Sequence, residues 1–112
     1  MTINKTEISG KGIRISLTQN NQEIARAFLY ILHNDLHQEP FALLEDVFVQ
    51  EPHRGQGNGS KIIQAAIDEV KKQNCYKLIC TSRHAKEEVH KLYQKHGFNN
   101  YGIEFRMDFE KE

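Results

Sequence analysis

A chain of 112 residues has room for one compact domain, so we treat residues 1–112 as a single domain. Its 15 basic and 15 acidic side chains cancel, and no overall positive field favours nucleic acid or an anionic membrane as a partner. No apolar run approaches the roughly 20 residues that span a bilayer, and residues 1–10 lack the apolar core of a signal peptide. We therefore expect a cytoplasmic protein.

The first half of the chain is predicted to form strands. Residues 12–18 alternate in polarity and carry β-branched side chains, which predicts a strand. Residues 19–22 are turn formers, and this tight turn favours 23–33 as the hairpin partner, although a helix could also use that segment. Residues 33–40 are predicted to form a loop. Residues 41–50 form a strand with apolar residues on both alternating sets, as expected when both faces of a sheet are covered.

The second half alternates helical and extended patterns. Apolar residues at helical spacing predict an amphipathic helix over 58–73, and 76–82 read as a short buried strand. A second helix is predicted over about 86–96, ended by Gly97, and 101–109 alternate again as a last strand. The order predicts an α/β fold with a mixed sheet of about five strands and two main helices, and with a parallel strand–helix–strand crossover. Tyr76, Phe48 and Phe105 are expected in its core rather than in contact with a cofactor.

A strand that runs into alternating glycines and then a helix is the strongest chemical signal, at VFVQEPHRGQGNGS (47–60). Gly55, Gly57 and Gly59 permit unusual backbone angles, so successive N–H groups can surround an anion at the helix N-terminus. A Walker A loop would need Gly-Lys-Ser/Thr, and a dinucleotide fingerprint would need G-x-G-x-x-G. Arg54, Gly57 and Gly59 instead match R/Q-x-x-G-x-G/A, the pyrophosphate turn of coenzyme A acetyltransferases. A glycine-rich connection that only turns the chain is the alternative interpretation.

The sequence around this turn resembles the GNAT superfamily of N-acetyltransferases over residues 43–109. The likeness is carried by the strand LLEDVFV, the turn and helix RGQGNGSKIIQAAIDEVKKQ, the strand CYKLICTS and the segment HKLYQKHGF. The run LEDVFV…RGQGNG…NCYKLI…LYQKHGF is similar to glucosamine-6-phosphate N-acetyltransferases, and TSRHAKEEVHKLYQKHGF resembles small bacterial GNATs, including aminoalkylphosphonate acetyltransferases. The amino-sugar enzymes usually carry an aspartate where this chain has Thr81 or Ser82, which is a departure from their pattern.

The resemblance implies acetyl-CoA as co-substrate, lying where the parallel strands 41–50 and 76–82 splay apart. Main-chain groups of Val47, Phe48 and Val49 are implied to hold the pantetheine arm and to polarise the acetyl carbonyl. The residues implied to hold the pyrophosphate are Arg54, Gly55, Gln56, Gly57, Asn58, Gly59 and Ser60. The substrate amine would then attack the thioester directly in a ternary complex, so neither cysteine needs a catalytic role.

Four side chains are candidates for proton transfer. Tyr93 lies where the family's general acid usually sits, and its alternative role is that of a core aromatic. Glu45 and Asp46 are acidic residues in an apolar strand, and strict alternation would send them to opposite faces. Either could align or deprotonate the amine, or serve as a structural carboxylate. His90 is a further candidate base, although surface histidines on helices are common.

The expected acceptor is a primary amine of a small molecule. The alternatives are acetylation of a protein or peptide, and a non-catalytic module that senses acyl-CoA. The six histidines are scattered, so no metal is expected. Many GNAT chains begin with a strand and two helices that wall the acceptor site, and residues 1–11 cannot supply them. We therefore expect a homodimer, with the C-terminal strand or the 23–40 region near the partner.

Overall fold

The computed structural model describes residues 1–110 and contains two compact units. The first unit is Met1–Cys80, and the second begins at Thr81. Each unit is described by itself below, and the single domain expected over 1–112 stays a prediction. Residues 1–9 carry no regular structure and are exposed.

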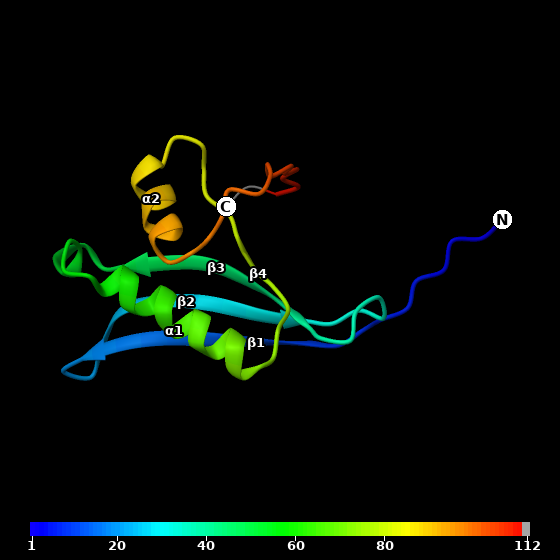
Figure 1. Ribbon diagram of the computed structural model, residues 1–112, viewed down its shortest axis with the longest axis horizontal. Helices are drawn as coiled ribbons and strands as arrows, with labels where there is room; N and C mark the ends of the chain where they lie inside the picture. Colours follow the sequence, from blue (N-terminus) through cyan, green and yellow to red (C-terminus); the bar gives the residue numbers. More distant parts are fainter. Residues whose placement is uncertain (111–112) are drawn as a thin grey trace. The chain divides into compact units, whose positions relative to one another are not determined.

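The first unit is a mixed sheet with one helix across it (Figure 1). The strand order is β1-β2-β3-β4; β1, β2 and β3 are antiparallel neighbours, and β3 and β4 are parallel. This confirms the predicted mixed sheet and its parallel crossover. The last strand is only three residues long, shorter than the predicted 76–82. The elements are β1 Gly10–Gln19, β2 Gln22–Leu32, β3 Phe41–Val49, the 3-10 helix η1 Glu51–His53, α1 Asn58–Lys72 and β4 Leu78–Cys80.

The hairpin between β1 and β2 settles the ambiguous segment 23–33 as a strand. Asn20 and Asn21 both have positive φ, 52° and 62°, and Gln19 pairs with Gln22 across the turn. A two-residue turn with two left-handed residues matches the right-handed twist of the strands it joins, and asparagine tolerates that conformation. The local turn therefore decided between helix and strand.

The core lies between α1 and one face of the sheet, where Figure 1 shows the helix crossing the strands. Small alanines in β2 and β3 let α1 approach the sheet closely, and Leu29 and Ile63 are the largest side chains that are fully buried. The helix contributes the apolar stripe that its spacing predicted. The buried apolar residues are Ile24, Ala25, Ala27, Leu29, Ile31, Ala42, Leu44, Ile62, Ile63, Ala66 and Val70.

A β-bulge at Asp46 explains why β3 has apolar residues on both alternating sets. The ladder pairs Phe28 with Glu45 and Arg26 with Phe48, so Asp46 and Val47 lie opposite the single residue between them. Asp46 has φ 53°, and alternation restarts after it. Before the bulge Ala42 and Leu44 face the core, and after it Val47 and Val49 do. The prediction that Phe48 is a core residue is wrong, because the bulge places it 38% exposed, and the same prediction for Tyr76 is wrong, since Tyr76 is 40% exposed.

The second unit contains one helix, α2 (Glu87–Lys95), which ends as predicted. Gly97 has φ 100°, and the Phe98 N–H donates to the Tyr93 carbonyl oxygen at 3.1 Å. This is a left-handed helix end with an apolar contact, since the Tyr93 and Phe98 rings lie 5.5 Å apart.

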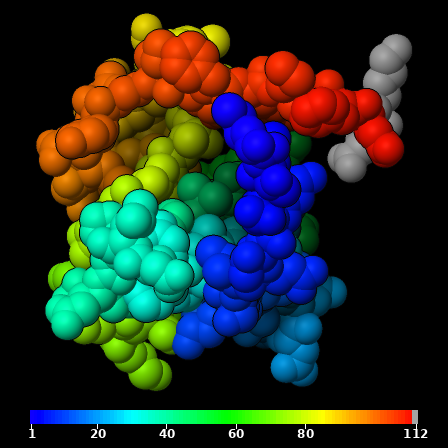
Figure 2. Space-filling model, turned by 90° about the vertical axis from the view of Figure 1, so that its right-hand side faces the viewer, coloured from blue at the N-terminus to red at the C-terminus, as the bar shows by residue number. Residues whose placement is uncertain are grey.

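The predicted strand over 101–109 is wrong. Within residues 1–110 this segment pairs with no strand, and Phe105, expected in the core, is exposed. Figure 2 shows the C-terminal residues, orange to red, as an extended run. Alternation expresses a preference for the extended conformation, whereas a strand also needs a neighbour with which to exchange backbone hydrogen bonds. The described residues therefore form four strands rather than about five.

Candidate functional site

The glycine-rich turn between η1 and α1 has the backbone that an anion site requires. Gly55 and Gly57 have φ 74° and 83°, and no heavy atom lies within 4 Å of where a Cβ would stand at either position. Glycine is therefore needed for the backbone angle and not because of crowding. Gly59 lies inside α1 without a positive φ, so the prediction of special backbone angles is confirmed at two of the three glycines.

The N-terminus of α1 presents backbone donors at this turn. The first intrahelical hydrogen bond runs from the Lys61 N–H to the Gly57 carbonyl oxygen at 3.1 Å. The N–H groups of Asn58 and Gly59 precede it in the first turn of the helix, where backbone donors lack a partner one turn earlier. Together with the helix dipole, these donors favour a negatively charged group.

Two side chains in the turn brace its shape. The Asn58 amide donates to the His53 carbonyl oxygen at 3.0 Å, and the Gln56 amide donates to the Pro52 carbonyl oxygen at 3.3 Å. Asn58 is also the buried polar residue of the described core. Both side chains thus bind the preceding 3-10 turn. Their contribution toward a phosphate would come from their backbone N–H groups.

Arg54 lies against the end of β3. Its Nε donates to the Val49 carbonyl oxygen at 2.7 Å, and its guanidinium carbon is 5.3 Å from the centre of the Phe48 ring. One of the five guanidinium N–H groups is used in this bond, so the others can still serve an anion. The role of Arg54 beside a pyrophosphate stays a prediction.

The parallel ladder between β3 and β4 ends early, next to the bulge. It pairs Ala42, Leu44 and the residue between them with Leu78–Cys80. Within the described residues, β3 continues from Glu45 to Val49 paired only with β2. Val47, Phe48 and Val49 therefore lie where the backbone edge toward β4 is unpaired. This fits the expected binding of an extended pantetheine arm along that edge.

An arginine–aromatic ladder on the face of the sheet away from α1 was missed by the sequence analysis. The guanidinium carbons of Arg14 and Arg26 lie 5.1 Å and 5.7 Å from the centre of the Phe28 ring, and that of Arg26 lies 5.1 Å from the Phe48 ring. Arg26 Nη1 also donates to the carbonyl oxygen of Asp46, so it holds the bulge. The sequence did contain a signal for this ladder, because arginines occupy one of the two alternating sets of positions in two apolar strands that pair with each other.

The outer end of this ladder carries an ion pair. Arg14 donates to both carboxylate oxygens of Glu23, at 3.0 Å and 2.6 Å, and the Ser16 hydroxyl donates to the same carboxylate at 2.7 Å. The hydrogen bonds from Arg14 and then Ser16 lower the pKa of Glu23. The pair is exposed, and its main effect is to hold the Arg14 side chain over the sheet.

Of the four proton-transfer candidates, two lie in the first unit and two in the second. Glu45 is half-buried and Asp46 is exposed, and the bulge removes the strict alternation on which their opposite placement rested. His90 Nε2 is 2.9 Å from the Arg83 carbonyl oxygen. A carbonyl can only accept, so Nε2 carries the proton and Nδ1 is the acceptor of the neutral ring. Tyr93 is half-buried against Phe98.

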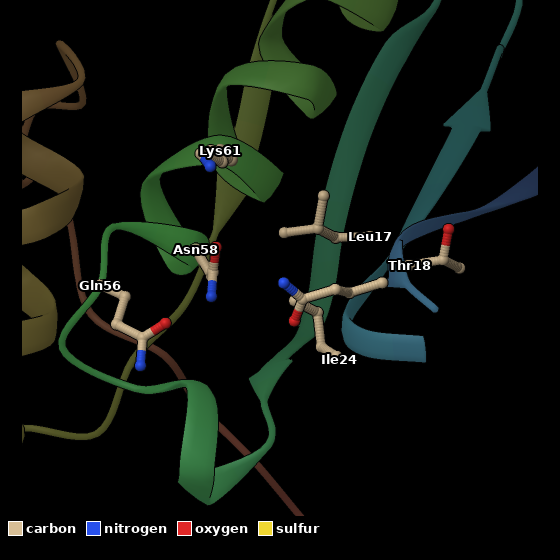
Figure 3. Close-up of a pocket in the computed structure, with 7 residues that line it drawn as sticks. Leu17, Thr18, Ile24, Gln56, Asn58 and Lys61 are labelled. Carbon is tan, nitrogen blue, oxygen red and sulfur yellow. The ribbon is translucent and has the colours of Figure 1, made fainter. Parts of the chain in front are cut away.

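A hollow of about 250 Å³ lies between the β1–β2 hairpin and the start of α1 (Figure 3). It shares only Gln56 and Asn58 with the predicted pyrophosphate residues. Its volume is below the roughly 300–1,000 Å³ of pockets that enclose drug-sized ligands, so it does not enclose a coenzyme. The lining residues are Leu17, Thr18, Gln19, Ile24, Gln56, Asn58 and Lys61.

Other features bear on chemistry and location. Both cysteines are free thiols, and burial raises the pKa of Cys80 to about 11, which makes it a poor nucleophile. Within residues 1–110, no three histidine, cysteine or carboxylate side chains gather as they would around a metal ion. The helices in the same range are too short or too polar to cross a membrane.

Comparison with known proteins decides the family. A model of the acetyltransferase (GNAT) family matches residues 9–98. The chain belongs to the GNAT acetyltransferase family. No curated protein is similar enough in sequence to count as a relative of this GNAT chain.

Several solved structures share its fold. A candidate acetyltransferase from Agrobacterium tumefaciens is 29% identical with a TM-score of 0.79, over 84% of this chain and 66% of that one. A transcriptional regulator from Bacillus halodurans is 21% identical with a TM-score of 0.82, over 88% and 66% of the two chains. Glucosamine-6-phosphate N-acetyltransferase from Arabidopsis thaliana is 22% identical with a TM-score of 0.79, over 88% and 67%. The GNAT chain thus spans about two thirds of the length of these structures, and the last two likenesses show the fold alone.

Proposed function

We propose that this GNAT domain transfers an acetyl group from acetyl-CoA to a primary amine of a small molecule within a ternary complex. One observation carries the proposal: the left-handed glycines Gly55 and Gly57 lead into the N-terminus of α1 shortly after β3, whose edge toward β4 is unpaired from Glu45 onward among residues 1–110. The turn supplies donors for a pyrophosphate, and the edge supplies backbone groups for the arm that joins the pyrophosphate to the thioester.

The backbone of β3 would polarise the reacting carbonyl. Main-chain N–H groups among Val47, Phe48 and Val49 that point to the unpaired edge can donate to the acetyl oxygen. Such donors stabilise the negative charge that develops there, and losing one typically lowers kcat by about 10²–10³. No protein nucleophile is needed, which agrees with the raised pKa of the Cys80 thiol.

Proton transfer completes the reaction. The amine nitrogen forms a bond to the acetyl carbon while the carbon–sulfur bond breaks, and the departing thiolate takes a proton. We assign that proton to the phenol of Tyr93, as the family resemblance implies. The proton that the amine releases would pass to Glu45, Asp46 or His90. For His90 the accepting atom would be Nδ1, since Nε2 donates to Arg83.

The test combines coenzyme binding with turnover. Free-thiol release from acetyl-CoA is measured with a panel of amino sugars, polyamines, aminophosphonates and peptides, and CoA binding is measured by calorimetry. We expect thiol release with at least one small amine, and thermal stabilisation by saturating acetyl-CoA of about 2.7 kcal/mol at 100 times its Kd. Release with peptides only would indicate a protein acetyltransferase. Binding without release from any amine would indicate an acyl-CoA sensor, and no binding would refute the proposal.

Tyr93→Phe separates the enzyme from the sensor. The substitution removes only the phenolic hydroxyl, so the ring contact with Phe98 at 5.5 Å is kept. We expect kcat to fall by about 10²–10⁴ while the Kd for CoA stays within twofold, because general acid catalysis acts on the departing thiolate and not on ground-state binding. Turnover equal to that of the wild type would show that Tyr93 is not the acid.

A further inference from the structure

A residue with an unusual backbone angle lies at the bulge in β3. Asp46 has φ 53°, in the left-handed region that residues other than glycine rarely adopt. Such angles persist only where the surrounding structure holds them, and they gather at functional sites. A bulge leaves its extra residue outside the regular ladder. The neighbouring strand β2 supplies the contact that holds this one, because Arg26 Nη1 donates to the Asp46 carbonyl oxygen.

Two aromatic rings hold the Arg26 side chain in place. Its guanidinium carbon lies 5.7 Å from the centre of the Phe28 ring and 5.1 Å from the centre of the Phe48 ring. A guanidinium group stacks on aromatic faces, and its planar fork loses little freedom when it then donates a hydrogen bond. Arg26 is therefore a rigid link from β2 to the bulge, and every residue of this link belongs to the first unit.

The direction of the backbone groups in β3 follows from its pairing with β2. The Gln50 N–H donates to the Ile24 carbonyl oxygen at 2.8 Å, so Gln50 directs its backbone groups toward β2. Successive residues of a strand direct these groups to opposite sides in alternation. Phe48 therefore also faces β2, whereas Val47 and Val49 direct their N–H groups to the edge toward β4, which is unpaired here within the described chain.

The Asp46 carbonyl and the Val47 N–H are the two ends of one peptide group. No peptide bond in the described chain is cis, so these two ends point in opposite directions. The bond from Arg26, on the β2 side, thus aims the Val47 N–H at the unpaired edge. A hydrogen bond to the carbonyl also polarises the peptide group, which makes its N–H a stronger donor.

Two donors point to the unpaired edge, and the length of the coenzyme separates them. In the proposed complex the pyrophosphate lies on the glycine turn that follows β3, and the pantetheine arm runs back along the strand. Val49 is the last residue of β3, and Val47 lies two residues further from the turn. The thioester is at the far end of the arm, so Val47 is the donor that its carbonyl reaches.

We infer that Arg26 is a positioning residue for acetyl transfer, which holds the Asp46–Val47 peptide so that the Val47 N–H donates to the acetyl carbonyl oxygen. The inference rests on the proposed function. Negative charge grows on this oxygen when the amine nitrogen bonds to the carbonyl carbon, and a fixed donor stabilises it. The charge is lost again when the carbon–sulfur bond breaks and the thiolate takes its proton. Arg26 acts through the backbone rather than on a substrate.

A substitution that spares the packing tests this role. Arg26→Met removes the hydrogen-bond donors and keeps an unbranched side chain that packs against both rings. We expect kcat for thiol release to fall about 10–100-fold, because the Val47 N–H is no longer held in line with the oxygen. The Kd for CoA should stay within about twofold, since CoA has no acetyl group, and so should the KM for the amine. Arg26→Lys keeps the charge but lacks the planar fork, so its kcat should lie between the two.

Arg14→Met is the matched control. Arg14 contacts the same Phe28 ring, at 5.1 Å, but its guanidinium binds the Glu23 carboxylate rather than the backbone of β3. This variant loses the same charge and the same kind of aromatic contact. Its kcat should equal that of the wild type. An equal fall in both variants would assign the effect to charge or stability and would overturn the inference.

The infrared band of the bound thioester carbonyl reports on the donor directly. Acetyl-CoA with a heavy carbon isotope at the carbonyl is bound in the absence of an amine, so this measurement needs no turnover. A hydrogen bond to a carbonyl lowers its stretching frequency. The band should therefore move to higher frequency in Arg26→Met and stay at the wild-type position in Arg14→Met.

Two further results would overturn the inference: a carbonyl band in Arg26→Met at the wild-type position, or a wild-type kcat in that variant. If the wild type binds acetyl-CoA but releases no thiol with any amine, the proposed transfer fails, and the carbonyl band alone decides whether Arg26 aims the Val47 N–H. A wild type that does not bind acetyl-CoA refutes both. If Arg26→Met does not fold, the same band and kcat are measured in Arg26→Lys, where wild-type values of both would overturn the inference.

Discussion

Replacing Gly57 by alanine separates the binding role of the glycine turn from its structural role. The residue is the N-cap of α1 with φ 83°, and nothing lies within 4 Å of the position that a Cβ would take. The substitution therefore introduces no clash in the free protein. It does force an L-residue into the left-handed region, which costs about 1–2 kcal/mol. Against a typical stability of about 5–15 kcal/mol, the variant should stay folded.

The effect on the coenzyme is expected to be larger than this strain. The open space beside Gly57 is where a bound pyrophosphate would approach the backbone, and a methyl group there keeps it away. A hydrogen bond from an N–H to a charged acceptor contributes about 1.5–3 kcal/mol, so losing one raises the Kd for CoA by about 10–150-fold. Pantetheine lacks the pyrophosphate, and its affinity should change little.

Gly97→Ala is the matched control. Gly97 also has a positive φ, 100°, with nothing within 4 Å of an added Cβ, and it follows the end of α2 in the second unit. It should lose a similar 1–2 kcal/mol in urea unfolding and keep the wild-type Kd for CoA in calorimetry. If Gly57→Ala binds CoA within twofold of the wild type, the turn does not hold the pyrophosphate. Equal losses of affinity in both variants would show a general effect of strain.

Three further predictions concern stability and pH. Ile63→Ala should cost about 2–5 kcal/mol in urea unfolding and Ile63→Val about 0.5–1.5, because Ile63 is fully buried; equal losses would contradict close packing there. Burial raises the pKa of Cys80 from 9.0 to about 11, so the unfolded chain releases this proton first and stability should fall as pH rises from about 9 to 11. Cys80→Ala should remove that slope. In the native protein, Cys75 should react with iodoacetamide faster than Cys80 does. The pKa of Glu23 is lowered from 4.5 by Arg14, so its contribution is present above that pH and is lost as pH falls through the folded value. Glu23→Gln should flatten the acid side of the stability curve, and an unchanged curve would show that the ion pair has no effect.

The sequence by itself determined the features that depend on neighbours along the chain. The turn residues Asn20 and Asn21 set the hairpin, and apolar spacing set α1 within one residue of its observed end. Gly55 and Gly57 stand out because few other residues accept their backbone angles, so the candidate anion site could be located before the structure was known. These features depend on residues that are close together in the chain, so they can be predicted from the sequence.

Only the tertiary structure decided the features that need a partner distant in the chain. The bulge at Asp46 exists because β3 must match β2 across the sheet, and it moves Phe48 out of the predicted core. The arginine–aromatic ladder appears once β1, β2 and β3 lie side by side and place Arg14 and Arg26 beside Phe28. Segment 101–109 shows that a local pattern is not sufficient for a strand. Its residues alternate as in a strand, but it has no strand pairing within the described chain. A strand forms through hydrogen bonds to a neighbouring strand, and no pattern within one segment can supply that neighbour.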